Sequence, residues 1–250
     1  MLFFAFFVTL SFNGLISSLS VANGLPAHSE LKAALSAVVQ EDNGGFGFNM
    51  WATVVDRDGI VKAVAFSGNQ RGDQWPGSRV ISAQKANTAN AFSLPELALS
   101  TANLFSAVQP GGSLFGLQFS NPVDTETAYR GSPQKYGTEN DPMVGRKIGG
   151  INVFGGGLAL YNNEGELIGA LGVSGDSSCA DHNIAWKVRH KLMLDYIPGG
   201  VSPAQDDNII YDIINGVSQS GWGHPACSPE AVKIAAELAK THPVRVKKSK

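Results

Sequence analysis

The feature that most constrains the fold is a strand-turn-strand pattern that occurs twice, about a hundred residues apart. One copy spans residues 51–70 and the other spans residues 157–177. In each copy two apolar runs flank a short polar turn that closes on an acidic residue and a glycine, at 58–59 and at 164–165. Glycine tolerates the positive φ of a tight turn, so such a pair between apolar runs is a strong hairpin signal. The sequence therefore predicts two β-hairpins.

The segments around the hairpins carry helical periodicity. In residues 28–40, for example, apolar side chains recur at i, i+3, i+4 and i+7, which is the spacing of an amphipathic helix. Paired strands with helices grouped separately favour an α+β fold, in which helices pack on an antiparallel sheet. We expect helices at 28–40, 79–92, 95–107, 177–195 and 229–240, and short additional strands at 114–119 and 151–154.

The N-terminus has the character of an export signal. It contains no charged side chain before Glu30, and residues 2–10 match the apolar core of a signal peptide in length. Small residues at Ser20 and Ala22 suit cleavage after Ala22. The segment lacks a Lys or Arg near its start, which leaves an uncleaved anchor as the alternative. We predict that residues 1–22 are a signal peptide, and that the mature protein is secreted or otherwise exported and is not bound to a membrane.

The rest of the chain reads as one domain over residues 25–227. No low-complexity linker divides it, although 109–150 and 196–227 are long, irregular segments rich in turn residues. Residues 228–250 form a predicted helix and a basic tail. The net charge of −2 argues against a nucleic-acid partner, which would require a basic face.

Two cysteines, Cys179 and Cys227, are present. In an exported protein an even pair most simply forms one disulfide, whereas two inert buried thiols are the alternative. The disulfide would attach the late loop that contains Cys227 to the start of the predicted helix at 177–195. The spacing of the cysteines excludes a zinc ribbon, and we expect no metal site apart from any haem iron.

The start of the same helix is a candidate anion site, because N-terminal backbone N–H groups attract carboxylates and phosphates. The residues concerned are Ser174, Gly175, Asp176, Ser177 and Ser178. Ordinary capping of the helix by Asp176 or Ser178 is the competing interpretation.

Five other side chains could contact a ligand. His182 and Arg189 fall on one face of the predicted helix, and the disulfide would bring the loop that carries His224 towards His182. Arg79 and Lys85, near the start of an earlier helix, could receive an anionic group or face water. A helix cap or a surface stripe would explain His182 equally well.

Three segments together resemble the GlcG/HbpS-type haem-binding proteins, also called the haem-degrading domain family. They are VVDRDGIVKAVAF (54–66), SRVISAQKANTANAF (78–92) and GGGLALYNNEGELIGALGVSGDSSCADHNIA (155–185). The resemblance implies a profilin-like fold with a five-stranded antiparallel sheet and flanking helices, and frequent assembly into homo-oligomers. This chain departs from the usual short domain by insertions at 109–150 and 196–227 and by its cysteine pair.

The resemblance implies a haem or another tetrapyrrole as ligand. We therefore expect an exported haem-binding protein, with peroxide-dependent haem degradation as a further activity. The iron would meet His182 or His224, and the propionates would lie near Arg79, Lys85 or Arg189.

Two alternatives belong to other classes of function. An enzyme acting on a small organic acid would hold its substrate carboxylate at residues 174–178, with Lys85 or Asp181 as acid or base. A non-catalytic oligomeric binding module would instead use the two insertions as its partner surface.

Overall fold

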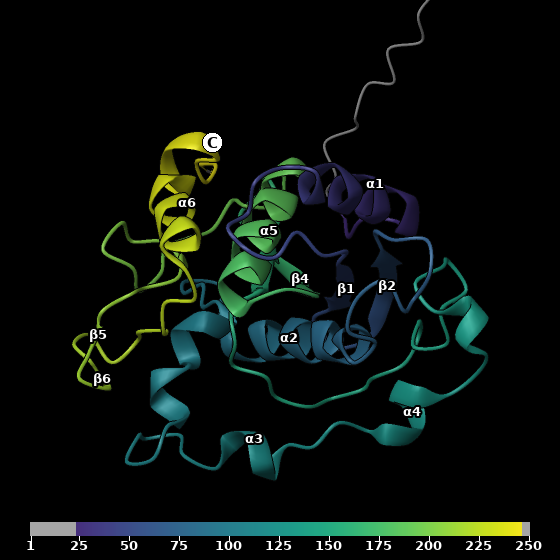
Figure 1. Ribbon diagram of the computed structural model, residues 1–250, viewed down its shortest axis with the longest axis horizontal. Helices are drawn as coiled ribbons and strands as arrows, with labels where there is room; N and C mark the ends of the chain where they lie inside the picture. The colour runs from purple at the N-terminus through teal and green to yellow at the C-terminus, as the bar shows by residue number, and fades with distance from the viewer. Residues whose placement is uncertain (1–23, 247–250) are drawn as a thin grey trace, which may run out of the picture.

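The computed structural model describes residues 24–246, so the predicted signal peptide and the last four residues of the basic tail lie outside the described residues. The two predicted hairpins are present (Figure 1). Their strands are β1 (Trp51–Asp56), β2 (Val61–Phe66), β3 (Gly157–Tyr161) and β4 (Leu167–Ser174). They form one antiparallel sheet in the order β2-β1-β4-β3, so the two hairpins join through β1 and β4.

Helices cover both faces of this sheet, which gives three layers (Figure 1). Helices α1 (His28–Val39) and α5 (Ser178–Lys191) lie on one face, and α2 (Ser78–Phe92) lies on the other. Helix α6 (Pro229–Thr241) packs beside α5. Because both faces are covered, β1 is apolar and buried along almost its whole length instead of alternating with polar residues.

Two glycines bring α2 unusually close to the sheet. A Cβ atom built on Gly172 of β4 would lie 1.9 Å from the carbonyl oxygen of Ser82. A Cβ atom on Gly157 of β3 would lie 2.5 Å from the carbonyl oxygen of Lys85. Only glycine permits this approach of two backbones. The close contact places the Lys85 side chain next to the start of α5.

The prediction of an α+β fold with an antiparallel sheet is confirmed, but within residues 24–246 the sheet has four strands, so the five-stranded profilin-like detail is not. The predicted strand at 151–154 is an extended segment outside the sheet. Two of its backbone N–H groups donate to side-chain oxygens. Asn152 N donates to Thr88 Oγ1 at 2.9 Å, and Phe154 N donates to Asn152 Oδ1 at 3.1 Å. Those bonds replace the ladder that a fifth strand would need.

The irregular segments also differ from the sequence prediction in detail. The predicted helix at 95–107 is replaced by two short 3₁₀ helices, η1 (Thr101–Leu104) and η2 (Ser106–Val108), and the predicted strand at 114–119 is replaced by a turn leading into α3 (Leu117–Ser120). A short apolar run does not by itself distinguish a strand from a turn or a short helix, which explains the error at 114–119. The remaining elements are α4 (Thr125–Tyr129), η3 (Pro133–Lys135), β5 (Ile213–Ile214) and β6 (Val217–Ser218). None of the helices in the described range is long and apolar enough to span a bilayer.

Candidate functional site

A buried ion pair, Lys85–Asp181, lies where α2 meets the start of α5. Lys85 Nζ is 2.6 Å from Asp181 Oδ2 and also donates to the carbonyl oxygen of Val173 at 3.2 Å. The other carboxylate oxygen of Asp181 accepts from Asp176 N at 2.9 Å. Burial raises the pKa of Asp181 to about 6, although the nearby Lys85 ammonium opposes the rise. A carboxyl with such a pKa can exchange a proton near neutral pH.

The N-terminus of α5 is capped by its own side chains. Ser177 is the N-cap residue and accepts from Ala180 N at 3.3 Å, whereas the sequence suggested Asp176 or Ser178. The Asp176 carboxylate accepts from Phe46 N at 3.0 Å and from Ser177 N. The predicted anion site therefore already contains a carboxylate of the protein, and several of its N–H groups have partners.

The other three residues of the predicted anion site, Ser174, Gly175 and Ser178, make contacts within the fold. Ser174 ends β4 opposite Trp51, and Gly175 approaches the backbone of Asn49 so closely that a Cβ atom would lie 2.6 Å from its carbonyl oxygen. Ser178 Oγ lies 3.5 Å from the Sγ atom of Cys227.

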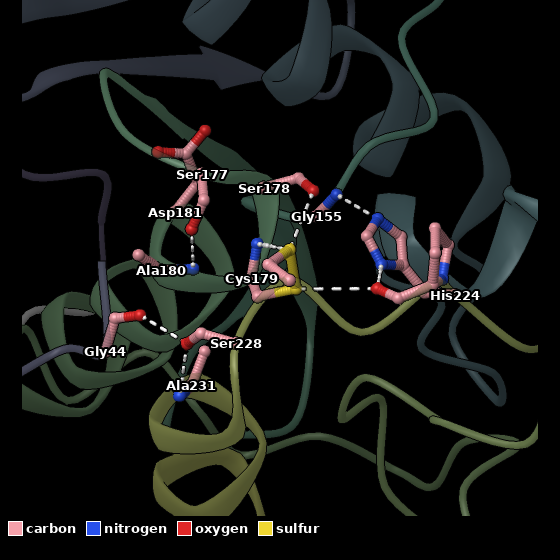
Figure 2. Close-up of a disulfide and its surroundings, with 12 residues drawn as sticks. Gly44, Gly155, Ser177, Ser178, Cys179, Ala180, Asp181, His224, Ser228 and Ala231 are labelled. Atoms are coloured by element: carbon pink, nitrogen blue, oxygen red, sulfur yellow. Dashed lines mark hydrogen bonds between the residues drawn. A yellow bond between two sulfur atoms is a disulfide. The ribbon is translucent and has the colours of Figure 1, made fainter. Parts of the chain in front are cut away.

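The predicted disulfide between Cys179 and Cys227 is confirmed (Figure 2). Cys179 is in the first turn of α5, and Cys227 immediately precedes Ser228, the N-cap residue of α6. Ser228 Oγ accepts from Ala231 N at 3.0 Å and donates to the carbonyl oxygen of Gly44 at 2.9 Å. The bond thus fixes the end of the 196–227 segment across the starts of two helices.

His182 and His224 are both buried and both lie against Gly155. Gly155 N donates to His224 Nε2 at 3.4 Å (Figure 2), and a Cβ atom on Gly155 would lie 3.0 Å from His182 Cβ. Burial lowers the pKa of His182 to about 3 and that of His224 to about 4, so both rings are neutral at physiological pH.

The hydrogen bonds of the two rings are structural. His182 Nε2 accepts from Ile209 N at 3.1 Å, and its Nδ1 atom is buried without a partner. His224 Nδ1 donates to the carbonyl oxygen of Pro225 at 2.8 Å. Both histidines therefore fasten the 196–227 segment to the core.

Arg79 and Arg189 are also buried and paired. The Arg79 guanidinium binds both oxygens of Asp141, with Nε 2.9 Å from Oδ2, and Arg189 binds both oxygens of Asp207, with Nη2 2.7 Å from Oδ1. Burial alone would lower the pKa of Arg189, but the Asp207 carboxylate outweighs it and raises that pKa. Each pair attaches one long segment to a central helix, 109–150 to α2 and 196–227 to α5.

Four clefts on the described surface stand out, and Lys85, Asp181, His182 and His224 line none of these four. Three have volumes of about 330, 380 and 330 Å³. The fourth has a volume of about 550 Å³ and lies between α1, the loop from β2 to α2, and residues 133–138. Its cations, Lys32 and Arg71, were not among the predicted site residues, because single charged residues on a helix and in a polar loop carry no sequence signal. Within residues 24–246 no cluster of three or more His, Cys, Asp or Glu residues could hold a metal ion.

The chain belongs to the HbpS-like family, described as haem-degrading protein HbpS-like, because the family model matches residues 27–189 of its 250 residues. This confirms the resemblance found in the sequence. No curated protein matches the chain significantly.

Solved structures similar to this chain include three proteins. A PduOC:haem complex is 25% identical with a TM-score of 0.46, and the match covers 67% of this chain and 94% of that one. Klebsiella pneumoniae protein ORFY is 24% identical with a TM-score of 0.45, with coverage of 70% and 95%. HbpS is 16% identical with a TM-score of 0.41, with coverage of 68% and 91%.

Proposed function

We propose that this protein is an exported haem-binding protein that degrades haem in the presence of peroxide. The observation that carries the proposal is the family match over residues 27–189, which includes both hairpins, α2 and most of α5. Bound haem supplies the iron-centred oxidative chemistry, with peroxide as the oxidant, while the protein supplies binding and orientation.

The predicted iron ligands do not fit haem in the observed conformation. His182 retains an unpartnered Nδ1 atom, but its ring is fully buried, and His224 is 1% exposed. The 196–227 segment covers both rings, and the Cys179–Cys227 bond holds the end of that segment in place. Iron coordination by either histidine would therefore require the segment to open. The cleft of about 550 Å³ is open and within the size range of small-molecule sites, so a ligand can enter it without that movement.

A haem titration followed by the Soret band tests binding. We expect a saturable shift in the parent protein that persists in His182→Ala and His224→Ala, provided that circular dichroism shows both variants folded. Loss of binding in one folded variant would identify that histidine as the iron ligand. It would also show that haem does not bind in the open cleft. No shift beyond that of an unrelated control protein would reject haem binding.

Peroxide dependence needs a separate measurement. We expect hydrogen peroxide to bleach the Soret band of the complex faster than that of haem bound to serum albumin, with formation of an open-chain tetrapyrrole. Equal rates, or bleaching without that product, would contradict a degrading activity and leave binding unaffected.

Export is supported by the disulfide, since such bonds persist in oxidising compartments. We propose that cleavage follows Ala22, so mass spectrometry of the exported protein should identify Asn23 as its first residue. An intact N-terminus in the exported fraction would contradict this.

The two alternative functions have weaker support. The helix terminus at 174–178 already holds the Asp176 carboxylate, which would repel a substrate carboxylate. Lys85 and Asp181 face each other and line none of the four clefts. A non-catalytic oligomeric binding module, with the two insertions as its partner surface, would show no Soret shift with haem and would still self-associate.

A further inference from the structure

We propose that the cleft of about 550 Å³ binds a flat dicarboxylate of the tetrapyrrole class, with Lys32 and Arg71 contacting its carboxylates. This inference rests on the proposed function and adds the place and the residues. We call the site the Lys32–Arg71 cleft. Its lining consists of Lys32, Phe66, residues 68–72, Pro76, Pro133, Gln134 and residues 136–138.

The charge of the lining selects an anion. Lys32 and Arg71 both line the cleft, and no Asp or Glu does. Neither cation has an ion-pair partner in the part of the chain that the structure describes, whereas the three predicted propionate contacts are all buried and paired. The nearby Asp73 binds the backbone N–H groups of Asn69 and Gln70, at 3.2 and 2.8 Å, and so shapes the loop. A carboxylate is the natural partner for an ammonium and for the two-pronged guanidinium.

The other part of the lining suits a flat apolar body. Phe66 is almost buried and stacks on Trp51, with ring centroids 4.4 Å apart and planes 19° apart. Tyr136 lies beneath the Arg79 guanidinium, whose carbon is 3.6 Å from the ring centre. Pro76 and Pro133 add apolar surface to the lining. Phe66 therefore closes the base of the cleft, and the half-buried Tyr136 and the two exposed prolines supply the apolar contact for a ligand whose carboxylates reach the cations.

The wall at 133–138 is rigid. It is held by the buried Arg79–Asp141 pair, by Gly137 N donating to Asp141 Oδ2 at 2.8 Å, and by the His28 ring, whose Nε2 donates to the carbonyl oxygen of Gly137 at 2.9 Å. Gly137 has φ +74°, and a Cβ atom there would lie 2.8 Å from Phe66 Cβ. The wall is therefore preformed, which reduces the entropy lost when a ligand binds. It belongs to the long 109–150 segment, so the cleft is a feature of this chain's insertion.

The lining predicts that carboxylates, more than iron, determine binding. Tyr136 is the lining residue of a type that ligates haem iron, and its hydroxyl already donates to the backbone carbonyl of Tyr129 or Arg130, at 3.1 or 3.2 Å. Iron-free protoporphyrin IX should therefore bind nearly as well as haem, and its dimethyl ester should bind much more weakly.

The test is an equilibrium titration of the exported protein with haem, protoporphyrin IX and protoporphyrin IX dimethyl ester. We expect Lys32→Gln and Arg71→Gln each to weaken binding of the two acids by about five- to tenfold, the loss of one charge-assisted contact. Lys62→Gln is the matched control: it removes the same charge from a lysine that is 47% exposed and outside the cleft. Gln134→Trp fills the cleft without changing charge and should also weaken binding.

Each outcome decides a separate point. If Lys32→Gln, Arg71→Gln and Gln134→Trp all bind haem with unchanged affinity, the Lys32–Arg71 cleft is not the binding site. The proposed function would still stand. Binding of haem but not of protoporphyrin IX would show that iron coordination dominates and would also overturn the inference. Failure of the parent protein to bind haem would reject the proposed function itself, and the inference with it. Equal affinity for protoporphyrin IX and its dimethyl ester would show that the two cations do not contact the ligand's carboxylates, which would overturn the inference.

Discussion

At the scale of single residues, the cations of this chain divide by burial. Arg79, Lys85 and Arg189 are each at most 2% exposed, and each has an aspartate partner. Lys32 and Arg71 are exposed at the edge of a cleft without such a partner. A charge taken out of water must be paired, so these three buried cations serve the fold, whereas Lys32 and Arg71 remain available to a ligand.

The Lys85–Asp181 pair gives a prediction about stability. We expect Asp181→Asn to lower the free energy of unfolding by about 3–5 kcal/mol, because the Lys85 ammonium then stays buried without its counter-ion. The double variant Lys85→Met/Asp181→Asn should recover much of that loss, and Lys62→Met should change stability by less than about 0.5 kcal/mol. Urea unfolding at neutral pH measures all three. A loss below about 1 kcal/mol in the single variant would show that the pair is unimportant.

At the scale of elements, the 196–227 segment shows how a stretch with little regular structure becomes ordered. It has only the two-residue strands β5 and β6, yet it is attached to α5 through Arg189–Asp207, through the ring of His182 and through the disulfide. These contacts replace the hydrogen-bonded ladders that order the sheet.

The two buried histidines make that attachment sensitive to acid. Their pKa values are about 3 and about 4 in the folded protein, against 6.5 for an exposed histidine. Below pH 6.5 the unfolded chain therefore binds protons that the folded chain does not, so stability falls as the pH falls towards about 4. The fall is about 1.4 kcal/mol per pH unit for each histidine.

Asp181 has the opposite effect, because its folded pKa of about 6 lies above the ordinary value of 3.8. It adds stability at low pH that is lost as the pH rises through about 6.

The histidine effect is tested by urea unfolding between about pH 7 and pH 4.5. The free energy of unfolding should fall less on acidification in His182→Gln and His224→Gln than in the parent. An unchanged slope in both variants would contradict burial of neutral rings.

The disulfide gives the second prediction at this scale. Its cysteines are 48 residues apart, so the bond restricts a long loop in the unfolded chain. Cys227→Ser should lower the free energy of unfolding by about 2–4 kcal/mol. Ala226→Ser, at the exposed neighbouring position, is the control and should have little effect. Thermal unfolding with and without reductant provides the comparison, and insensitivity of the parent to reductant would argue against this role.

At the scale of the whole molecule, the sheet and its helices form a layered core, and the long segments lie around it (Figure 1). Large apolar side chains remain exposed side by side: Phe46 is 70% exposed and Trp75 is 53% exposed, with ring centroids 6.4 Å apart. Exposed apolar surface of this kind is commonly covered by a partner. We expect the exported protein to be a homo-oligomer, with a light-scattering mass that is a multiple of the chain mass. A monomer mass at every concentration would contradict this expectation.

Local sequence determined the hairpins and the four long helices, and the presence of two cysteines allowed a single disulfide. Hairpin turns and amphipathic helices depend on residues close together in the chain, so their signals are visible in the sequence. The turn at 58–59 and the spacing in 28–40 were sufficient for β1, β2 and α1. The error at 151–154 arose because that segment's hydrogen-bond partner, Thr88, is distant in the sequence.

Tertiary structure alone decided the roles of the charged residues. Arg79 and Asp141 are 62 residues apart, and Lys85 and Asp181 are 96 apart, so neither pair leaves a local pattern. Whether a cation is buried in a pair or exposed in a cleft depends on which segments pack together, and the cleft between Lys32 and Arg71 exists only because the 133–138 wall folds back beside α1. The chain thus carries its family and its secondary structure in local patterns, whereas its candidate binding site is created by long-range packing.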